Sequence, residues 1–397
     1  MWRGRHVVLG VTGGIAAYKS VHLARDLTVR GATVDVVLSH GATRFVGVPT
    51  FEAVTRRRVH SSLWEPGRAL EHIALPDRAD LIIVAPATAQ LIARAAQGIA
   101  DDLLSTLLLA APGRVLLAPA MNDEMYANPA TQANLARLQD RGWHAVGPVV
   151  GALAEGPSDR PGRMAEPEAI IAHAERVLAG EGPLQRAKVL VTAGPTREGI
   201  DPVRVVTNRS SGRMGYKLAE AAWRRGAEVV LVSGPSHEPV PHGVTVLRVE
   251  TTAEMRDAVR RHLPSSDVLI MAAAPADYRP VTTRDSKLPR SDGGFTLAFE
   301  STEDILLATM PERHARLTTV GFALETGDAV RKGRQKLDRK QLDMIVVNDA
   351  LEPGAGFEID TNAVTILDVH GTETRVSLRD KALVAEAILD AIEHYRG

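Results

Sequence analysis

Residues 208–212 read Asn-Arg-Ser-Ser-Gly, a combination of side chains and backbone groups suited to binding an anion. The loop follows an apolar run at 189–192, which predicts a buried parallel strand, and a helical pattern begins near Met214. Backbone N–H groups of a glycine-containing loop at a helix N-terminus bind anions, and the helix dipole reinforces that binding. We therefore predict an anion site at this loop.

Two further sets of residues in the second half could act on the same ligand. Asp277 lies near a predicted strand end and Lys287 follows ten residues later, which suits metal-assisted nucleotide chemistry, although solvated loops often show the same spacing. Lys336 and Lys340 are four residues apart, so their ammonium groups share one face of a predicted helix. That face is either a nucleotide contact or an ordinary solvated basic surface.

The first half carries polar or glycine residues where four predicted strands end, which is where ligands bind in open α/β sheets. These ends are Thr12-Gly13-Gly14, Ser39, Thr88 and residues 119–122. Together they suit a phosphorylated, planar cofactor, and the absence of a Gly-x-Gly-x-x-Gly fingerprint disfavours NAD. His72 and Asn122 are candidate site residues, but structural histidines and asparagines in turns are common.

The composition predicts a globular chain without strong charge. Its 397 residues suggest two or three domains, and 45% hydrophobic with 4% aromatic residues predict mainly aliphatic cores. A formal charge of −1 gives no general attraction to nucleic acid or anionic membranes. The absence of cysteine excludes disulfides and thiolate catalysis and fits a cytoplasmic location. No secretory signal is expected, and proline and arginine within the most apolar stretch, 103–121, exclude a membrane span there.

Strand and helix patterns alternate, which predicts an α/β fold with two Rossmann-like domains and mainly parallel sheets, the first of them flavodoxin-like. In the first half we expect strands at 6–12, 33–39, 79–88 and 114–122, and a helix from Leu91 past Gly98 towards Leu109.

The second half repeats this plan, because the apolar run after Arg225-Gly226-Ala227 echoes the one after Arg30-Gly31-Ala32. It is expected to end with a basic helix at 329–342, a strand at 344–349, a strand pair around 363–376 and a helix at 379–395. Glycine and proline at 179–184 mark a linker, so the predicted domains are 1–182 and 183–397.

Four segments of the first half resemble the flavin-dependent cysteine decarboxylases, and among them the phosphopantothenoylcysteine decarboxylases. They are VTGGIAAYK at 11–19, HIAL at 72–75, APATAQLIARAAQGIADDLLST at 85–106 and PAMNDEMY at 119–126. The resemblance implies FMN as cofactor and His72 and Asn122 as active-site residues. The cofactor contacts it implies are Thr12, Gly13, Gly14, Ser39, Thr88, Thr106 and Met121.

The implied reaction is chemically sensible. Loss of CO2 from a cysteine carboxylate needs an electron sink, which a saturated thiol does not offer. Oxidation of the CH2–SH group to a thioaldehyde by flavin creates that sink, and CO2 leaves to give an enethiol. Reduced flavin and a proton donor then restore the saturated thiol, while the protein aligns and protonates the substrate.

One position departs from the family pattern. The family carries a cysteine in a flap before a Pro-Gly-Arg-Met motif, as proton donor in the final reduction, and the flap at 151–164 has Glu155 in that place. We hypothesise that Glu155 is the acid, because flap closure would exclude water and favour its protonated form. The alternative is that the donor lies elsewhere or that the last half-reaction is slow.

Nearly the whole second half resembles the phosphopantothenate–cysteine ligases. The motifs, in order, are AGPTRE at 193–198, DPVR at 201–204, TNRSSGRMG at 207–215, APADYRP at 274–280, GFALET at 321–326 and VVND at 346–349. The resemblance implies that phosphopantothenate attacks the α-phosphate of CTP, giving an acyl-cytidylate and pyrophosphate, after which the amine of cysteine displaces CMP. Mg2+ is expected with the triphosphate.

The same resemblance implies residue roles. Asn208 would hold the acyl-cytidylate, Lys287 would serve the second half-reaction or the phosphates, and Asp277 would also bind the metal. The implied nucleotide contacts are Met271, Ala272, Ala273, Asp277, Lys287, Glu303, Asp304, Ile305, Leu306, Phe322, Lys336 and Lys340. Residues 287–290 and 301–306 depart from the family's Lys-Ile-Lys-Lys and Lys-Asn-Pro-Asp-Ile runs, which affects the details of nucleotide contact.

The two resemblances cover almost the whole chain and imply a bifunctional enzyme of coenzyme A biosynthesis, with product 4′-phosphopantetheine. They also imply a homo-oligomer with trimeric flavin domains and dimeric ligase domains, up to a dodecamer, and no nucleic-acid or membrane partner. One alternative is an active ligase fused to a flavin domain whose decarboxylation is lost or altered, because of Glu155. Another is a regulatory subunit without turnover, against which the presence of His72, Asn122, Asn208 and Lys287 argues.

Overall fold

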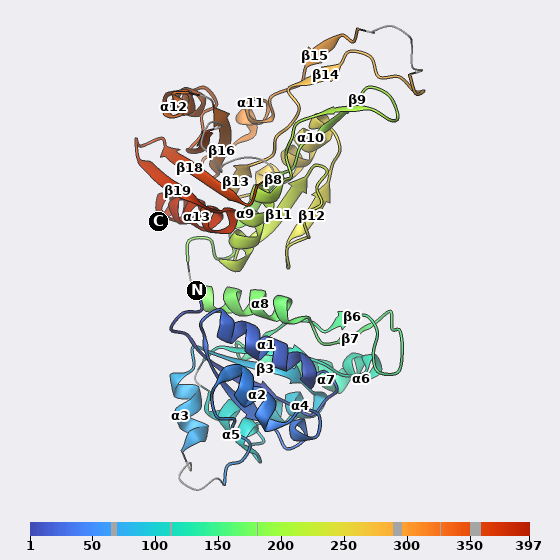
Figure 1. The fold of residues 1–397 in the computed structure, drawn as a ribbon, viewed down its shortest axis with the longest axis vertical. Helices are drawn as coiled ribbons and strands as arrows, with labels where there is room; N and C mark the ends of the chain where they lie inside the picture. The colour runs from blue at the N-terminus through green and yellow to red at the C-terminus, as the bar shows by residue number, and fades with distance from the viewer. Residues whose placement is uncertain (65–69, 112, 181, 289–295, 326, 350–358) are drawn as a thin grey trace. The chain divides into compact units, whose positions relative to one another are not determined.

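The computed structural model describes residues 1–64, 70–111, 113–180, 182–288, 296–325, 327–349 and 359–397. The chain divides into two compact units, Met1–Gly180 (unit 1) and Glu181–Gly397 (unit 2), both shown in Figure 1. Each unit is a layered α/β fold around its own mainly parallel sheet, which confirms the expected fold class. Among the described residues, no helix has the length and apolar character that crossing a membrane requires.

Unit 1 is built on a five-stranded parallel sheet in the order β2-β1-β3-β4-β5, the flavodoxin-like order. Its strands are β1 (His6–Val11), β2 (Thr33–Leu38), β3 (Leu81–Ala87), β4 (Val115–Pro119) and β5 (His144–Ala145). Since β3 lies on the other side of β1 from β2, the connections after β1 and β3 diverge. That divergence is the switch point at which such sheets bind ligands.

Helices cover both faces of this sheet with separate apolar cores. One core takes side chains from α1 (Ala17–Val29), α2 (Val48–Thr55) and α8 (Pro167–Ala179). The other takes them from α3 (Glu71–Arg78), α4 (Ala89–Gln97), α5 (Leu103–Ala110) and α7 (Pro129–Asp140). The remaining elements are η1 (Ala42–Arg44), α6 (Asp123–Ala127) and the antiparallel pair β6 (Val149–Val150) and β7 (Pro161–Arg163).

The single helix expected from Leu91 towards Leu109 is wrong. Gly98 adopts a left-handed φ of 75° and ends α4, and Asp102 begins α5 by accepting a hydrogen bond from the Ser105 N–H at 2.7 Å. Apolar residues recur on both sides of the break, so the periodicity alone could not reveal it.

Unit 2 contains an eight-stranded sheet in the order β12-β11-β8-β13-β16-β17-β18-β19. The pairings are parallel from β12 to β17 and antiparallel for β18 and β19. The strands are β8 (Lys188–Ala193), β11 (Glu228–Ser233), β12 (Thr245–Arg248), β13 (Val268–Met271), β16 (Thr318–Glu325), β17 (Met344–Asp349), β18 (Thr361–Asp368) and β19 (Glu373–Asp380). The parallel part is doubly wound about a switch point between β8 and β13.

Two groups of helices sandwich this sheet. The helices α10 (Thr252–His262), α11 (Ile305–Ala308) and α12 (Ala329–Arg339) share one apolar core, and α9 (Arg213–Arg224) packs against α13 (Lys381–Arg396) on the other face. The basic helix α12, which was expected to reach residue 342, ends at Arg339. Two antiparallel arms extend from the sheet, β9 (Arg197–Gly199) with β10 (Val205–Thr207) and β14 (Tyr278–Pro280) with β15 (Phe299–Ser301) (Figure 1). Two short 3-10 helices, η2 (Leu263–Ser265) and η3 (Met310–Glu312), complete the unit.

Helix α9 lies so close to β8 that only glycine fits at position 215. A Cβ atom built on Gly215 would lie 2.5 Å from the Cβ of Ala193 and 2.8 Å from the carbonyl oxygen of Thr192. Real Cβ atoms do not approach backbone so closely, so any side chain would push the helix away. This contact holds the N-terminus of α9, and with it the loop at 208–212, against the end of β8.

We predict that Gly215→Ala destabilises unit 2 by about 1–3 kcal/mol, because overpacking against backbone outweighs the gain in helix propensity. Urea unfolding followed by tryptophan emission, to which unit 2 contributes only through Trp223, measures the effect. Gly199→Ala is the control, since its Cβ would lie at an ordinary 3.6 Å from the Thr283 methyl group. Equal unfolding midpoints for Gly215→Ala and the unaltered chain would contradict the close contact.

Candidate active sites

A cavity of about 530 Å³, the unit 1 cavity, lies where β1, β3 and β4 end. Gly13 and Gly14 line it after β1, Thr88 lines it after β3, and Met121 and Asn122 line it after β4. The structure therefore brings these predicted site residues together at the switch point of the sheet.

Three other predicted cofactor contacts lie outside the lining and support the loops around it. Thr12 is buried, donates a hydrogen bond to the carbonyl oxygen of Pro86 at 2.7 Å and accepts one from the Thr88 N–H at 3.2 Å. It thus ties the ends of β1 and β3 together. Ser39 bonds within the turn after β2, and Thr106 bonds within the first turn of α5.

The carboxamide of Asn122 has a fixed orientation. Its Oδ1 accepts hydrogen bonds from the N–H groups of Glu124 at 2.9 Å and Met125 at 3.4 Å, which caps the N-terminus of α6. Its Nδ2 donates to Oε1 of Glu155 at 2.6 Å. Because the cap occupies the oxygen, Asn122 offers only N–H donors to a group inside the unit 1 cavity.

The flap, residues 151–164, covers one side of this cavity and is fastened to the start of α6. The Ser158 hydroxyl donates to Oδ2 of Asp123 at 2.5 Å; this bond lowers the pKa of Asp123, and the Arg160 guanidinium acts in the same direction. Glu155 lines the cavity with its side chain exposed, so the exclusion of water expected for it is absent in this arrangement.

His72 lies on α3 and does not line the unit 1 cavity. Its Nδ1 is buried and has no hydrogen-bond partner within the part of the chain that the structure describes. The adjacent Leu70 and Ile73 are 69% and 45% exposed. One copy of the chain therefore does not bring His72 and Asn122 together.

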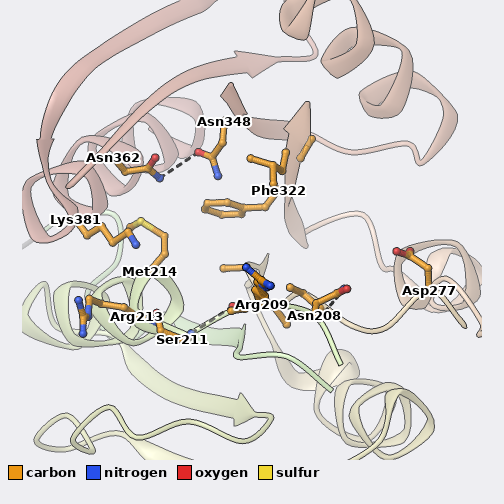
Figure 2. Close-up of a pocket in the computed structure, with 17 residues that line it drawn as sticks. Asn208, Arg209, Ser211, Arg213, Met214, Asp277, Phe322, Asn348, Asn362 and Lys381 are labelled. Atoms are coloured by element: carbon orange, nitrogen blue, oxygen red, sulfur yellow. Dashed lines mark hydrogen bonds between the residues drawn. The ribbon is translucent and has the colours of Figure 1, made fainter. Parts of the chain in front are cut away.

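A second cavity of about 500 Å³, the unit 2 cavity, lies at the switch point between β8 and β13 (Figure 2). The predicted residues that line it are Asn208, Ala272, Ala273, Asp277 and Phe322. The loop at 208–212 leads directly into α9, whose cap Gly212 has a φ of 82°. This confirms the predicted junction between loop and helix.

The carboxamide of Asn208 has the opposite polarity to that of Asn122. Its Nδ2 donates to the carbonyl oxygens of Ala274 at 3.3 Å and Pro275 at 2.9 Å. These bonds leave Oδ1 for a ligand, so Asn208 presents an acceptor to the unit 2 cavity.

Arg213 and Lys381 bring positive charge to the same cavity, and carboxylates balance it. Arg213 donates from Nε to Glu238 at 2.8 Å and pairs with Asp360, and these bonds raise its pKa. Lys381 is only 4% exposed, and burial together with Arg213 lowers its pKa, against the effect of Asp360 and Glu238. These four groups carry no net charge.

Sequence reasoning missed Lys381, Asn362 and, in the unit 1 cavity, Lys19. A signal existed for Lys381, because it falls on the apolar stripe of α13 formed by Val384, Ile388 and Ile392. A lysine on such a stripe is rarely buried without a partner or a site. Lys19 is similarly buried on α1 and pairs with Glu166 at 2.9 Å. Nothing in the sequence pattern distinguishes Asn362.

The remaining predicted nucleotide contacts do not line the unit 2 cavity. Lys336 pairs with Glu325 at 2.5 Å and Lys340 with Asp304 at 2.8 Å, so the two ammonium groups bind different carboxylates. Met271 is buried at the end of β13, Glu303 pairs with Arg256, and Ile305 and Leu306 are buried in the core.

Lys287 is exposed, and the backbone beside it is anchored by Asp201. The buried carboxylate of Asp201 accepts N–H hydrogen bonds from Leu288 at 3.1 Å and from Val203 and Arg204 at 2.8 Å each. Burial opposes its charged form, but these bonds outweigh burial and the pKa of Asp201 is lowered. The adjacent family departure, at Pro289 and Arg290, lies outside the described residues.

We predict that Asp201→Asn releases the segment around Lys287, because an amide nitrogen cannot accept the Leu288 N–H. Tryptic cleavage after Lys287 should become several-fold faster in the variant and should stay unchanged in the control Asp285→Asn. A lowered pKa means that the carboxylate stabilises the fold above the ordinary aspartate range and that this is lost as the pH falls through the folded-state value. In the unaltered chain, cleavage within the same segment by an acid-stable protease should therefore accelerate only at acidic pH. Equal cleavage of both variants at neutral pH would exclude the anchor.

Comparison with known proteins decides the family. Residues 1–178 match the flavoprotein family, and residues 184–395 match the DNA/pantothenate metabolism flavoprotein C-terminal domain. The chain is 46% identical to the coenzyme A biosynthesis bifunctional protein CoaBC of Vibrio cholerae over 98% of both chains. This chain belongs to the CoaBC family. CoaBC proteins combine phosphopantothenoylcysteine decarboxylase with phosphopantothenate–cysteine ligase in coenzyme A biosynthesis, which confirms the bifunctional activity expected from the motifs.

Two solved structures are similar to separate parts of this CoaBC chain. The C-terminal domain of a CoaBC protein is 40% identical, with a TM-score of 0.46, and covers 54% of this chain and 97% of its own. The FMN-dependent cysteine decarboxylase SpaF is 30% identical, with a TM-score of 0.36, and covers 43% of this chain and 98% of its own. The flavoprotein domain is homologous to FMN-binding decarboxylases.

Proposed function

We propose that unit 2, with 183–397 as the ligase domain, joins 4′-phosphopantothenate to cysteine using CTP. Unit 1, with 1–182 as the decarboxylase domain, then converts phosphopantothenoylcysteine to 4′-phosphopantetheine. The observation that carries the first step is the unit 2 cavity, which surrounds one space with a helix N-terminus, the acceptor oxygen of Asn208 and the aromatic ring of Phe322. Phosphate, amine and nucleobase each find a suitable partner there.

Each group around this cavity has a distinct task. The N-terminus of α9 and Arg209 hold phosphate oxygens, while Phe322 stacks on the pyrimidine. Oδ1 of Asn208 accepts a hydrogen bond from the amine of cysteine and so holds that nucleophile beside the acyl-cytidylate carbon. Lys287, on the segment that Asp201 anchors, neutralises the leaving phosphates.

Mg2+ enters with the triphosphate. Within the described ranges, no cluster of three histidine, aspartate or glutamate side chains is arranged to hold a metal ion by itself. Asp277 is a single carboxylate on the cavity wall, and Mg2+ commonly binds one or two carboxylates together with substrate phosphates. The residues present therefore fit a metal shared with the nucleotide.

The unit 1 cavity fits FMN. Its volume of about 530 Å³ lies within the usual range for small-molecule sites, and it occupies the switch point at which flavodoxin-like sheets hold FMN. A Cβ built on Gly14 would meet only ordinary contacts, the Thr88 methyl at 3.6 Å and Cγ of Pro86 at 4.0 Å, so the backbone of this loop is open to a ligand. Gly13, Met121 and Met125 complete the wall. FMN supplies the reversible two-electron oxidation of the substrate thiol.

Asn122 binds the substrate, and Glu155 acts as the proton donor. The N–H donors of Asn122 bind the substrate carboxylate, the position that the Glu155 carboxylate occupies in this structure. An arriving substrate carboxylate displaces the Glu155 carboxyl group from these donors and leaves it beside the substrate. Once CO2 has left, protonated Glu155 gives its proton to the enethiol carbon as the thiol is restored.

We predict that Glu155→Gln keeps CO2 release but accumulates the oxidised enethiol product, because glutamine cannot deliver the proton. To test this, phosphopantothenoylcysteine is supplied to the variant, and the CO2 released and the free saturated thiol are both measured. A fall in saturated thiol of roughly tenfold or more matches the loss of a general acid. Glu168→Gln, on α8 and outside the unit 1 cavity, is the control. Unchanged thiol yield in Glu155→Gln would assign the donor elsewhere.

The absence of His72 from the lining of the unit 1 cavity supports a homo-oligomer. Exposed apolar side chains lie at both places: Leu70 and Ile73 beside His72, and Ile15 and Tyr18, 65% and 55% exposed, at the cavity. Contact between two such surfaces would bury them and bring His72 of one copy to the cavity of the next. A ring of three copies satisfies this head-to-tail contact.

Unit 2 carries a separate exposed apolar surface on its two arms, formed by Val203, Val205, Tyr278 and Phe299. Pairing of two copies through the arms gives a dimer. Trimers of unit 1 joined by dimers of unit 2 build an assembly of up to twelve chains.

We predict that His72→Asn and Asn122→Asp, each inactive in decarboxylation, restore activity when mixed as unfolded chains and refolded together. A site shared between copies is intact when His72 comes from one variant and Asn122 from the other, so random mixing restores roughly a quarter of the normal activity. Ligase activity, measured by pyrophosphate release, should be normal in every sample. If mixed chains stay as inactive as either variant, His72 acts within its own chain.

One assay separates the proposed function from its rivals. Phosphopantothenate, cysteine and CTP are supplied to the full chain, and pyrophosphate and CO2 are measured separately. Release of both supports the proposal, pyrophosphate alone supports a ligase fused to an altered flavin domain, and neither supports a subunit without turnover. A cytoplasmic location stays a prediction from the absence of cysteine.

A further inference from the structure

Two carboxamides from neighbouring strands meet in the unit 2 cavity. Asn348 is on β17 and Asn362 on β18, and Nδ2 of Asn362 donates to Oδ1 of Asn348 at 3.2 Å (Figure 2). Both line the cavity together with Phe322. Asn348 is half-buried, whereas Asn362 is only 4% exposed.

A backbone group sets the orientation of both carboxamides. The N–H of Ala363 donates to Oδ1 of Asn362 at 3.1 Å, and a backbone N–H can only be a donor. Asn362 must therefore turn its NH2 group towards Asn348, and Asn348 must turn its oxygen towards Asn362. The NH2 group of Asn348 is then left to point into the cavity, on the side of Phe322 (Figure 2).

The surroundings of this NH2 group suit an uncharged ring. In the register between β16 and β17, Phe322 lies opposite Val346 and Leu324 lies opposite Asn348, so Phe322, Leu324 and Asn348 share one face of the sheet. That face offers an aromatic surface with N–H donors at its edge. The nearby charges of Arg213, Lys381, Glu238 and Asp360 sum to zero, so these four groups place no net charge on a ring bound there.

We propose that Asn362 is a positioning residue for nucleotide selection: it fixes Asn348 so that Asn348 donates to an acceptor on the base that stacks on Phe322. This rests on the proposed use of CTP by unit 2. On cytosine the acceptors that Asn348 can reach are the carbonyl oxygen O2 and the ring nitrogen N3. A hydrogen bond from Asn348 and stacking on Phe322 hold the base, and no charged group has to be buried beside it.

Replacing Asn362 by aspartate reverses this polarity. An aspartate at 362 still accepts the Ala363 N–H but can no longer donate to Asn348. The carboxamide of Asn348 then turns to donate to the new carboxylate, and its oxygen faces the base acceptor. The oxygen of Asn348 and the acceptor atom of the base then face each other, and the hydrogen bond between Asn348 and the base is lost.

We predict that Asn362→Asp raises the KM for CTP roughly ten- to hundredfold, with kcat at saturating CTP changed much less. Pyrophosphate release by the full chain measures both constants. Analogues of CTP that weaken one acceptor, 2-thio-CTP and 3-deaza-CTP, give a second readout: at least one should have a raised KM with the unaltered chain, and Asn362→Asp should lose that discrimination.

A double-substitution cycle separates positioning from a structural role. If Asn362 acts through Asn348, Asn362→Asp adds no further rise in KM to Asn348→Ala. Tryptophan emission on heating, to which unit 2 contributes through Trp223, tests whether each variant folds, and Asn134→Asp, on α7 of unit 1, is the matched control. A normal KM in Asn362→Asp, or additive effects in the cycle, would overturn this assignment alone. Absence of pyrophosphate release from CTP by the unaltered chain would overturn the proposed nucleotide and this assignment with it.

Discussion

Close contact between backbone segments at glycine determines where both cavities lie. A Cβ on Gly13 would lie 2.7 Å from the carbonyl carbon of Gly41, and one on Gly215 would lie 2.5 Å from the Cβ of Ala193. In unit 1 the contact holds the loop after β1 against the loop after β2, and in unit 2 it holds α9 against the end of β8. Both contacts lie where the connections between the strands of the sheet diverge. The space beyond the strand ends stays open, and the loops that border it present backbone groups and short polar side chains.

Buried polar groups then hold those loops in place. Thr12, just after β1, satisfies two backbone groups at the end of β3. Asp201 satisfies the N–H of Leu288, beside Lys287, and two N–H groups in the turn between β9 and β10. A buried threonine or aspartate without such partners would be strongly unfavourable, so each side chain fixes the loops that satisfy it. A side chain that looks like a ligand contact in the sequence can therefore also hold the loops in place, as Thr12 does.

The sequence was sufficient for the fold class and for the central strands of both sheets, because period and turn residues are local, whereas β12 and the two arms were not predicted. It was insufficient wherever the outcome depended on distant parts. The end of α4 depends on the left-handed backbone angle of Gly98, which the apolar pattern does not show. The ion pair of Lys340 with Asp304 depends on two segments that are distant in the sequence and close in the fold. His72 shows a further limit, since its place relative to the unit 1 cavity depends on contact with another copy in the assembly that we propose.

The same device recurs at both sites: a backbone group decides which end of a carboxamide faces the ligand. A backbone N–H group donates to the oxygen of Asn122, so the NH2 group of Asn122 faces the unit 1 cavity. Another donates to the oxygen of Asn362, which in turn orients Asn348 so that the NH2 group of Asn348 faces the unit 2 cavity. Backbone carbonyls occupy the nitrogen of Asn208, so an acceptor faces the unit 2 cavity. A carboxamide carries no charge, so burying it avoids the large desolvation penalty of an ion. Its polarity is also independent of pH, and selection at these positions therefore rests on the folded backbone and not on titration.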